Sequence, residues 1–185
     1  MSGERYGDGQ ASDSGRHHVT HRPSTSAAWA RAAFAAIALV LSLAAPVAAG
    51  PLEDATTASG RRDYAISLRL WRPLADQGDA IAQFNLGLTY DKGWGVPQND
   101  AEAAKWYRLA ADQGNANAQN DLAVMYTKGE GVPQDFVRAH MWFNLSAARG
   151  GQSSASNRDS IAKLMTPAQI AEAEKLAREW QPKRP

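Results

Sequence analysis

The 185-residue sequence contains no cysteine. This absence excludes disulfides, thiolate zinc sites and a cysteine nucleophile, and it also excludes a lipid attached through cysteine. An excess of charge is missing too, because 20 lysines and arginines are balanced by 19 aspartates and glutamates. Histidine is scarce: three of the four lie in the stretch "HHVTH" at 17–21, and the fourth is His140. We therefore expect no metal site and no cofactor.

Long hydrophobic runs are also scarce, and the one at residues 32–49 stands out. It follows Arg31, carries no charge and ends in the small residues "VAA". This pattern predicts a secretory signal peptide that is cleaved after Ala49. A membrane anchor is the alternative, because 18 residues are just enough to span a bilayer. We accordingly expect a periplasmic or secreted protein, or else an inner-membrane protein whose single anchor holds the folded part outside the cytoplasm.

The charge of the part after the predicted cleavage point bears on its partners. Residues 50–185 contain 16 basic and 16 acidic side chains, so their formal net charge is zero. Nucleic-acid affinity depends on an excess of lysine and arginine. We therefore expect no nucleic-acid partner, and contact with a membrane only if the 32–49 segment stays uncleaved.

An internal repeat organises the rest of the chain. The octets "GWGVPQND" at 93–100 and "GEGVPQDF" at 129–136 lie 36 residues apart, and residues 78–113 match residues 114–149 at 16 of 36 positions. A period of this length indicates a stacked solenoid. The earlier stretch "LWRPLADQGDA" matches "WYRLAADQGNA", so half a repeat precedes the two full ones.

Each full repeat is predicted to form two helices, A and B, at about 79–91 and 100–113 in the first one. Apolar residues recur at spacings of three and four, which places them on one helical face. On this pattern Trp106 and Trp142 belong to the core. The octet between the helices is a corner, since its glycines end helix A and Asn99 is placed to cap helix B. It lacks the Lys-Ser or Lys-Thr of a phosphate loop.

The stretch "AQFNLGLTYDKGWGVPQNDAEAAKWYRLAADQGN" resembles the Sel-one-like repeat, a branch of the tetratricopeptide superfamily. The resemblance covers about residues 62–150. It implies an all-α fold, an α-solenoid of antiparallel helix pairs in a right-handed superhelix. It also implies a scaffold or adaptor for other proteins. Some secreted members of the family carry a disulfide in each repeat, whereas this chain must rely on packing.

The ends of the solenoid need caps that cover its apolar faces. At the C-terminal end, "MTPAQIAEAEKLAREW" predicts a helix with Thr166 as N-cap and Gln169 completing a capping box. The expected organisation is an N-terminal extension with signal peptide or anchor at 1–49, a linker at 50–60 and the solenoid at 61–181. The solenoid comprises a half repeat at 61–77, repeats at 78–113 and 114–149, and a C-terminal helical cap at 152–181, followed by a frayed tail.

No constellation of residues indicates catalysis. His140 lies on the second helix B, at the position that Ala104 has in the first repeat, and we expect it at the surface. Glu172 and Glu174 lie two residues apart, so on a helix they point to different sides. We therefore expect a protein that is not an enzyme and has no catalytic residues.

A partner is expected on the concave surface lined by the A helices. Positions identical in both repeats build the stack, whereas positions that differ are free to serve a ligand. The candidate partner-binding residues are Ile81, Phe84, Asn85, Leu88, Trp94, Asn117, Asn120, Asp121 and Val124. An apolar patch of this kind suits an amphipathic helix or an extended peptide.

Two functions remain open at this point. The first is a scaffold or adaptor of the cell envelope, a monomer that binds another protein or peptide. The second is a binder of cell-wall fragments or another small ligand in the solenoid groove, where Trp94 and Phe84 would stack on sugars.

Overall fold

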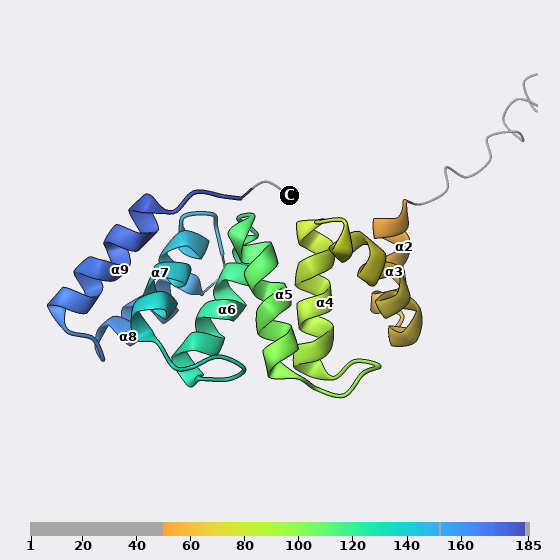
Figure 1. Ribbon diagram of the computed structural model, residues 1–185, viewed down its shortest axis with the longest axis horizontal. Helices are drawn as coiled ribbons and strands as arrows, with labels where there is room; N and C mark the ends of the chain where they lie inside the picture. Colours follow the sequence, from red (N-terminus) through yellow and green to blue (C-terminus); the bar gives the residue numbers. More distant parts are fainter. Residues whose placement is uncertain (1–49, 152, 184–185) are drawn as a thin grey trace, which may run out of the picture. The chain divides into compact units, whose positions relative to one another are not determined.

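The computed structural model describes residues 50–151 and 153–183. Over these residues the chain forms eight helices and no strand. The helices are α2 (Pro51–Gly60), α3 (Tyr64–Asp76), α4 (Ala80–Lys92), α5 (Asp100–Asp112), α6 (Ala116–Lys128), α7 (Phe136–Ala147), α8 (Ser154–Ala162) and α9 (Pro167–Glu179). They are stacked in chain order (Figure 1), which confirms the all-α repeat fold.

The helices pack as consecutive pairs. Helix α4 packs on α5 and α6 on α7, which are the A and B helices of the two full repeats, and α2 packs on α3. Successive pairs join through α3 with α4, α5 with α6, and α7 with both α8 and α9. No helix within the described ranges is both long and apolar enough to cross a bilayer.

Three aromatic residues at the same position of successive pairs anchor the core. Trp71, Tyr107 and Phe143 lie 36 residues apart on α3, α5 and α7, and each is at most 2% exposed. The residue changes, but a large ring fills the space between the two helices of each pair. Their polar atoms differ: the Trp71 indole donates to Ser59 Oγ at 3.1 Å and the Tyr107 hydroxyl to Asp91 at 3.2 Å, while Phe143 has none.

The repeated octet forms the corner between the helices of a pair, as predicted. Gly93 ends α4 in the left-handed region, and Asn99 begins α5 by accepting a hydrogen bond from the Glu102 amide at 3.0 Å. Glu102 lies three residues after Asn99, where the acidic residue of a capping box would accept from the Asn99 amide. Its carboxylate instead pairs with Lys105 at 2.7 Å, and the Asn99 amide donates to the Tyr90 carbonyl. The half of the capping box that depends on Glu102 is therefore missing, whereas Thr166 and Gln169 form the complete box at α9.

The second glycine of each octet lies against the preceding helix pair. A Cβ atom on Gly95 would lie 2.9 Å from the Cβ of Tyr64, in the first turn of α3. A Cβ atom on Gly131 would overlap the backbone carbonyl of Asp100, in the first turn of α5. Because Tyr64 and Asp100 occupy equivalent positions, the same close contact joins two successive pairs of the stack.

Buried glutamines repeat along the same joints. The Gln83 amide donates to the Ala75 carbonyl at 3.1 Å, and the Gln119 amide donates to the Ala111 carbonyl at the same distance. Each bond ties a helix A to the last turn of the preceding helix B. The same carbonyls also accept from the backbone amides of Gly78 and Gly114, so each glutamine supplies a second hydrogen bond at the helix end.

The prediction of a linker at 50–60 is wrong, because Pro51–Gly60 forms helix α2. Its sequence is rich in threonine and serine and gives little indication of an apolar face. The helix forms because Ala55 and Ala58 are buried, and Ala55 belongs to the same core cluster as Trp71. The half repeat is thereby completed to a helix pair with a short turn.

The prediction of a frayed tail after α9 is also wrong for residues 182–183, the part of the tail that the structure describes. The Lys183 amide donates to the carbonyl of Asp112 at 2.8 Å, and the Lys183 ammonium pairs with the Asp112 carboxylate at 2.8 Å. The chain after α9 therefore returns to the end of α5.

Candidate binding groove

Three cavities adjoin one another along α6. The amide cavity, of about 550 Å³, is lined by Phe84, Asn117, Asn120, Asp121 and Gly150. The acidic cavity, of about 270 Å³, includes Leu88, Asp91, Tyr107, Asp121, Val124 and Lys128 in its lining. The apolar cavity, of about 230 Å³, includes Val124, Thr127, Phe143, Asn157, Ser160 and Ile161. Asp121 belongs to the first two and Val124 to the last two, so we refer to all three together as the α6 groove.

The amide cavity is held by side chains of α6 and their partners. The Asn120 amide donates to the Asp121 carboxylate at 3.0 Å, and the Asn120 carbonyl accepts from the Ser154 hydroxyl at 3.0 Å. The ring of Phe84 packs on Tyr107, with ring centroids 5.8 Å apart. The cavity thus combines amide and carboxylate groups with one aromatic edge.

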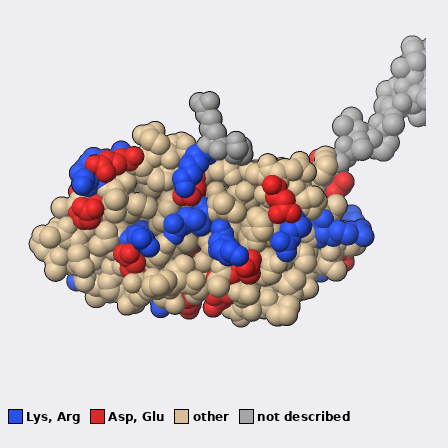
Figure 2. Space-filling model, in the orientation of Figure 1, with Lys and Arg blue, Asp and Glu red and all other residues tan. Residues whose placement is uncertain are grey.

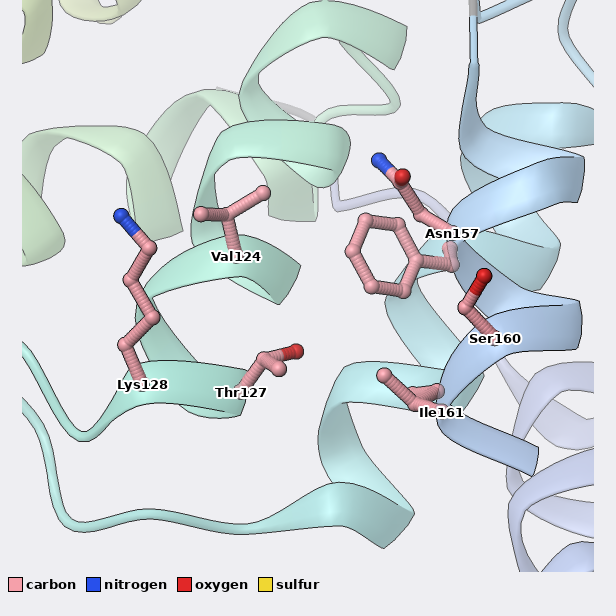
Figure 3. A pocket seen from close by; sticks show the side chains of 7 residues that line it. Val124, Thr127, Lys128, Asn157, Ser160 and Ile161 are labelled. Atoms are coloured by element: carbon pink, nitrogen blue, oxygen red, sulfur yellow. The ribbon is translucent and has the colours of Figure 1, made fainter. Parts of the chain in front are cut away.

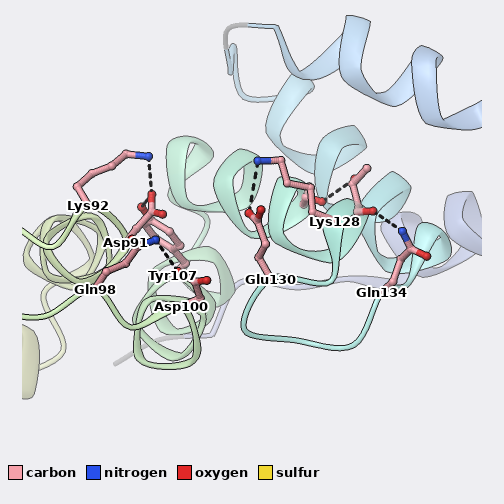
Figure 4. A network of polar contacts seen from close by, with 10 residues as sticks. Asp91, Lys92, Gln98, Asp100, Tyr107, Lys128, Glu130 and Gln134 are labelled. Carbon is pink, nitrogen blue, oxygen red and sulfur yellow. Dashed lines mark hydrogen bonds and ion pairs between the residues drawn. The ribbon is translucent and has the colours of Figure 1, made fainter.

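The acidic cavity contains a polar network beneath α4 and α6 (Figure 4). The Tyr107 hydroxyl donates to Asp91, whose carboxylate also pairs with the Lys92 ammonium at 2.9 Å. On the other side Lys128 pairs with Glu130 at 3.4 Å. Burial raises the pKa of the Tyr107 phenol, which keeps it protonated as a donor. The hydrogen bond that the Lys92 ammonium donates to the Asp91 carboxylate raises the pKa of Lys92.

Among the described residues Asp121 forms no ion pair, because the ammonium groups of Lys92 and Lys128 pair with Asp91 and Glu130. Burial is the main reason that the pKa of Asp121 is raised, and the nearby Asp91 acts in the same direction. The hydrogen bond from Asn120 and the charge of Lys92 act in the opposite direction. A partly buried carboxylate without a cationic partner carries a desolvation cost that a bound cation would offset.

The apolar cavity lies between α6 and α8 (Figure 3). Val124 and Thr127 from α6 face Ile161 and Ser160 from α8. Phe143 from α7 also lines the cavity. The side chain of Lys128 lies beside Val124, and its ammonium group is directed away from the other side chains. The centre of the cavity therefore presents hydrocarbon.

The structure brings six of the nine candidate residues into the α6 groove and leaves three outside it. The six are Phe84, Leu88, Asn117, Asn120, Asp121 and Val124. Ile81 is on α4, 49% exposed. Asn85 donates to the Ile81 carbonyl of its own helix at 2.9 Å. Trp94 is stacked on Tyr64 with centroids 5.2 Å apart, which covers one face of its ring.

Sequence reasoning missed Asp91, Tyr107, Phe143 and the α8 residues of the groove. It compared positions of helix A and the joint but not those of helix B, to which Tyr107 and Phe143 belong, and it left out Asp91 near the end of helix A. A signal was present, because Asp91 differs from Thr127 and Tyr107 from Phe143 at equivalent positions. Comparing the repeats over their whole length would have found these three residues, whereas the α8 residues lie outside both repeats.

His140, expected at the surface, is buried with 4% of its area exposed. The expectation was wrong because helices α8 and α9 both pack on α7. The equivalent Ala104 is also 4% exposed, so the position is buried in both repeats. Burial lowers the pKa of His140, and its Nδ1 has no hydrogen-bond partner among the described residues. Within those residues, no group of three or more acidic or histidine side chains is arranged to hold a metal.

The helix pairs, the corner octets and the groove on the A helices define an α-solenoid of the tetratricopeptide-like class. The family model described as Sel1 repeat matches residues 58–79, 80–115 and 116–151. The chain therefore belongs to the Sel1 repeat family. Proteins of this family generally mediate protein–protein interactions, and their fold is typically a non-enzymatic scaffold.

Two solved structures are similar to this chain. One is the crystal structure of a protective antigen from uropathogenic Escherichia coli with an SLR fold, at 30% identity and a TM-score of 0.67. It is matched over 70% of this chain and 29% of its own. The other is a Sel1 repeat protein from Oxalobacter formigenes, at 27% identity and a TM-score of 0.53. It is matched over 72% of this chain and 58% of its own, so this chain spans less than two thirds of either structure. No protein with a curated function matches significantly.

Proposed function

We propose that this protein is a non-enzymatic scaffold or adaptor of the cell envelope that binds another protein or peptide on the face of its A helices. The observation that carries the proposal is the α6 groove, in which side chains of α4, α6 and α8 line three adjoining cavities. Solenoids bind partners along such extended surfaces.

The charge pattern is in keeping with a protein partner. Basic and acidic side chains are interspersed over the face shown in Figure 2. A nucleic-acid site would present a stripe of lysine and arginine. Because residues 50–185 also have a formal net charge of zero, we expect partner specificity to rest on individual cavities, with little long-range steering by charge.

Placement in the envelope, as a periplasmic or secreted monomer, rests on the segment at 32–49. Helix α2 begins at Pro51, directly after the predicted cleavage point, so cleavage after Ala49 leaves every described helix intact. N-terminal sequencing of the protein recovered from a periplasmic fraction checks this placement. A first residue of Gly50 supports a cleaved signal, whereas an intact 32–49 segment in the membrane fraction assigns an inner-membrane anchor.

Photo-crosslinking in the source cells tests partner binding. A crosslinkable residue replaces Ile81, which lies three positions before Phe84 and hence on the same side of α4. The matched control replaces Leu109 on α5, because its exposed fraction of 47% is close to the 49% of Ile81. A dominant adduct from position 81 alone supports the proposal. Equal adducts at both positions, or none at either, contradict it.

The amide cavity favours a second candidate function, the binding of a cell-wall fragment or another small ligand. Two asparagines and Asp121 provide hydrogen-bonding groups beside the Phe84 ring, which suits a hydroxylated ligand. A ligand that binds only the folded state raises the melting temperature. Thermal shift with soluble wall fragments, repeated with Asn117→Ala, therefore separates this function from protein binding.

A further inference from the structure

The acidic and apolar cavities are the same place in two successive repeats. Adding 36 to the residue number gives a residue of the second cavity for seven of the nine residues that line the first, all except Lys128 and Glu130. The equivalent pairs are Leu88 and Val124, Asp91 and Thr127, Tyr107 and Phe143, Asp121 and Asn157, Val124 and Ser160, and Met125 and Ile161. The solenoid thus presents one kind of cavity twice.

The charged and phenolic groups of the first cavity are missing from the second. Asp91 is replaced by Thr127, the Tyr107 hydroxyl is missing in Phe143, and Asp121 is replaced by Asn157. Of the other pairs, Val124 is replaced by Ser160, which adds a hydroxyl but no charge, and Lys92 recurs as Lys128. A cation is therefore favoured in the first cavity over the second, and a hydrocarbon group in the second over the first.

The acidic cavity has one more carboxylate than it has lysines, and this excess negative charge favours a cation. Its lining carries three carboxylates and two lysines, and the lysines pair with Asp91 and Glu130. Asp121 keeps only the amide of Asn120 as a partner among the described side chains. The Tyr107 oxygen, whose proton goes to Asp91, can still accept a hydrogen bond. Oxygen acceptors of this kind match the N–H donors of an ammonium or guanidinium group.

The size and spacing of the cavities indicate the form of the ligand. At about 270 and 230 Å³, each is smaller than the roughly 300–1,000 Å³ typical of small-molecule sites. The acidic cavity is bounded by α4 and α6 and the apolar cavity by α6 and α8, so the width of α6, about 10 Å with its side chains, separates their centres. A polyproline II chain advances about 3.1 Å per residue and places residues i and i+3 on the same side, so a separation of about three residues covers that distance.

We propose that the α6 groove binds an extended segment of the partner that places a lysine or arginine in the acidic cavity and an apolar side chain in the apolar cavity. The two side chains are separated by about three residues of polyproline II chain. This inference rests on the proposed function and adds the chemistry of the partner segment. A lysine or arginine is chosen because its charge complements the Asp121 carboxylate.

The test measures the binding of fluorescent peptides to the full chain by polarisation. The peptides have a serine background and carry one arginine and one leucine, from adjacent to about six residues apart. Binding is expected to be strongest at a separation of about three residues. Replacing either the arginine or the leucine by serine should weaken binding at least about tenfold. A hydrogen bond to a charged group and the burial of a leucine side chain each contribute more than the energy of a tenfold change.

The variants use residues that the chain itself has at the equivalent positions. Asp121→Asn copies Asn157, and the triple variant with Asp91→Thr and Tyr107→Phe converts the acidic cavity into the chemistry of the apolar one. Either change should remove at least about tenfold of the preference for arginine over serine. The matched control is Glu172→Gln, the same loss of charge at an exposed site on α9. Should the triple variant lose its helical circular dichroism, Asp121→Asn decides alone.

Three results overturn the proposal: no dependence on arginine at any separation, an arginine preference that Asp121→Asn leaves unchanged, or an equal loss in Glu172→Gln. Dimerisation that Asp121→Asn abolishes would assign the groove to a second copy and also overturn it. The photo-crosslink at Ile81 distinguishes failure of this inference from failure of the proposed function. A partner crosslinked there without arginine dependence removes this inference alone, whereas failure of both removes the proposed function as well.

Discussion

Replacing Gly131 by alanine is expected to be far more damaging than the same change at another glycine with similar backbone angles. Gly131 has φ +68° and Gly150 has φ +78°, so alanine costs about 1–2 kcal/mol of backbone energy at either position. A Cβ atom at Gly150 meets no atom within 4 Å. At Gly131 it meets the Asp100 carbonyl and lies 2.8 Å from the Ala101 amide.

The difference between the two sites is therefore the contact between successive helix pairs. Overpacking against backbone adds about 1–3 kcal/mol, because the first turn of α5 must move. We expect Gly131→Ala to lower the free energy of unfolding by about 2–5 kcal/mol, and Gly150→Ala to lower it by about 1–2 kcal/mol.

Urea denaturation followed by far-ultraviolet circular dichroism measures both changes. An unchanged slope of free energy against urea concentration shows that the comparison is one of stability. Equal losses in the two variants would refute the reasoning, because the octet would then act only as a turn within its own pair.

Three further predictions concern burial, protonation and the tail. Trp142→Ala is expected to cost about 3–5 kcal/mol in urea denaturation, and Trp106→Ala clearly less, because Trp142 is 3% exposed while Trp106 is only half-buried; equal costs would contradict this. Since burial lowers the pKa of His140, the unfolded chain binds its proton first, and the free energy of unfolding should fall as the pH drops below about 6.5. His140→Gln should reduce that fall, and an unchanged pH profile would show that His140 is not its source. Lys183→Ala should cost less than about 1 kcal/mol, because its ion pair with Asp112 is largely exposed on the lysine side; a larger loss in urea denaturation would contradict this.

Much of the fold could be predicted from the sequence, because each repeat contains the residues that end one helix and begin the next. The octet places the end of one helix and the start of the next, and the Thr166 box places α9. Helix α2 could not be predicted in this way. Its few apolar residues give no strong period, and it is stabilised by contact with Trp71, a tertiary effect that local propensity does not contain.

The site could be predicted only in part. Comparing the repeats on helix A located Asp121 and Val124, which do line the groove. It missed Tyr107 because a large aromatic at that position also serves the core, and a single residue can do both. Burial of His140 depended on the helices that cover α7, which the repeat alignment does not describe.

The return of the tail to α5 changes how the C-terminal end of the stack opens. In a solenoid each pair contacts its neighbours, so opening spreads inward from the ends one pair at a time. The bond from Lys183 to Asp112 bypasses α6 and α7 and connects the chain end to an inner helix pair. Detachment of α9 together with its tail must therefore also release a contact at α5. The end of the chain thus couples the terminal cap directly to an inner helix pair that α8 and α9 do not otherwise adjoin in the order of the stack.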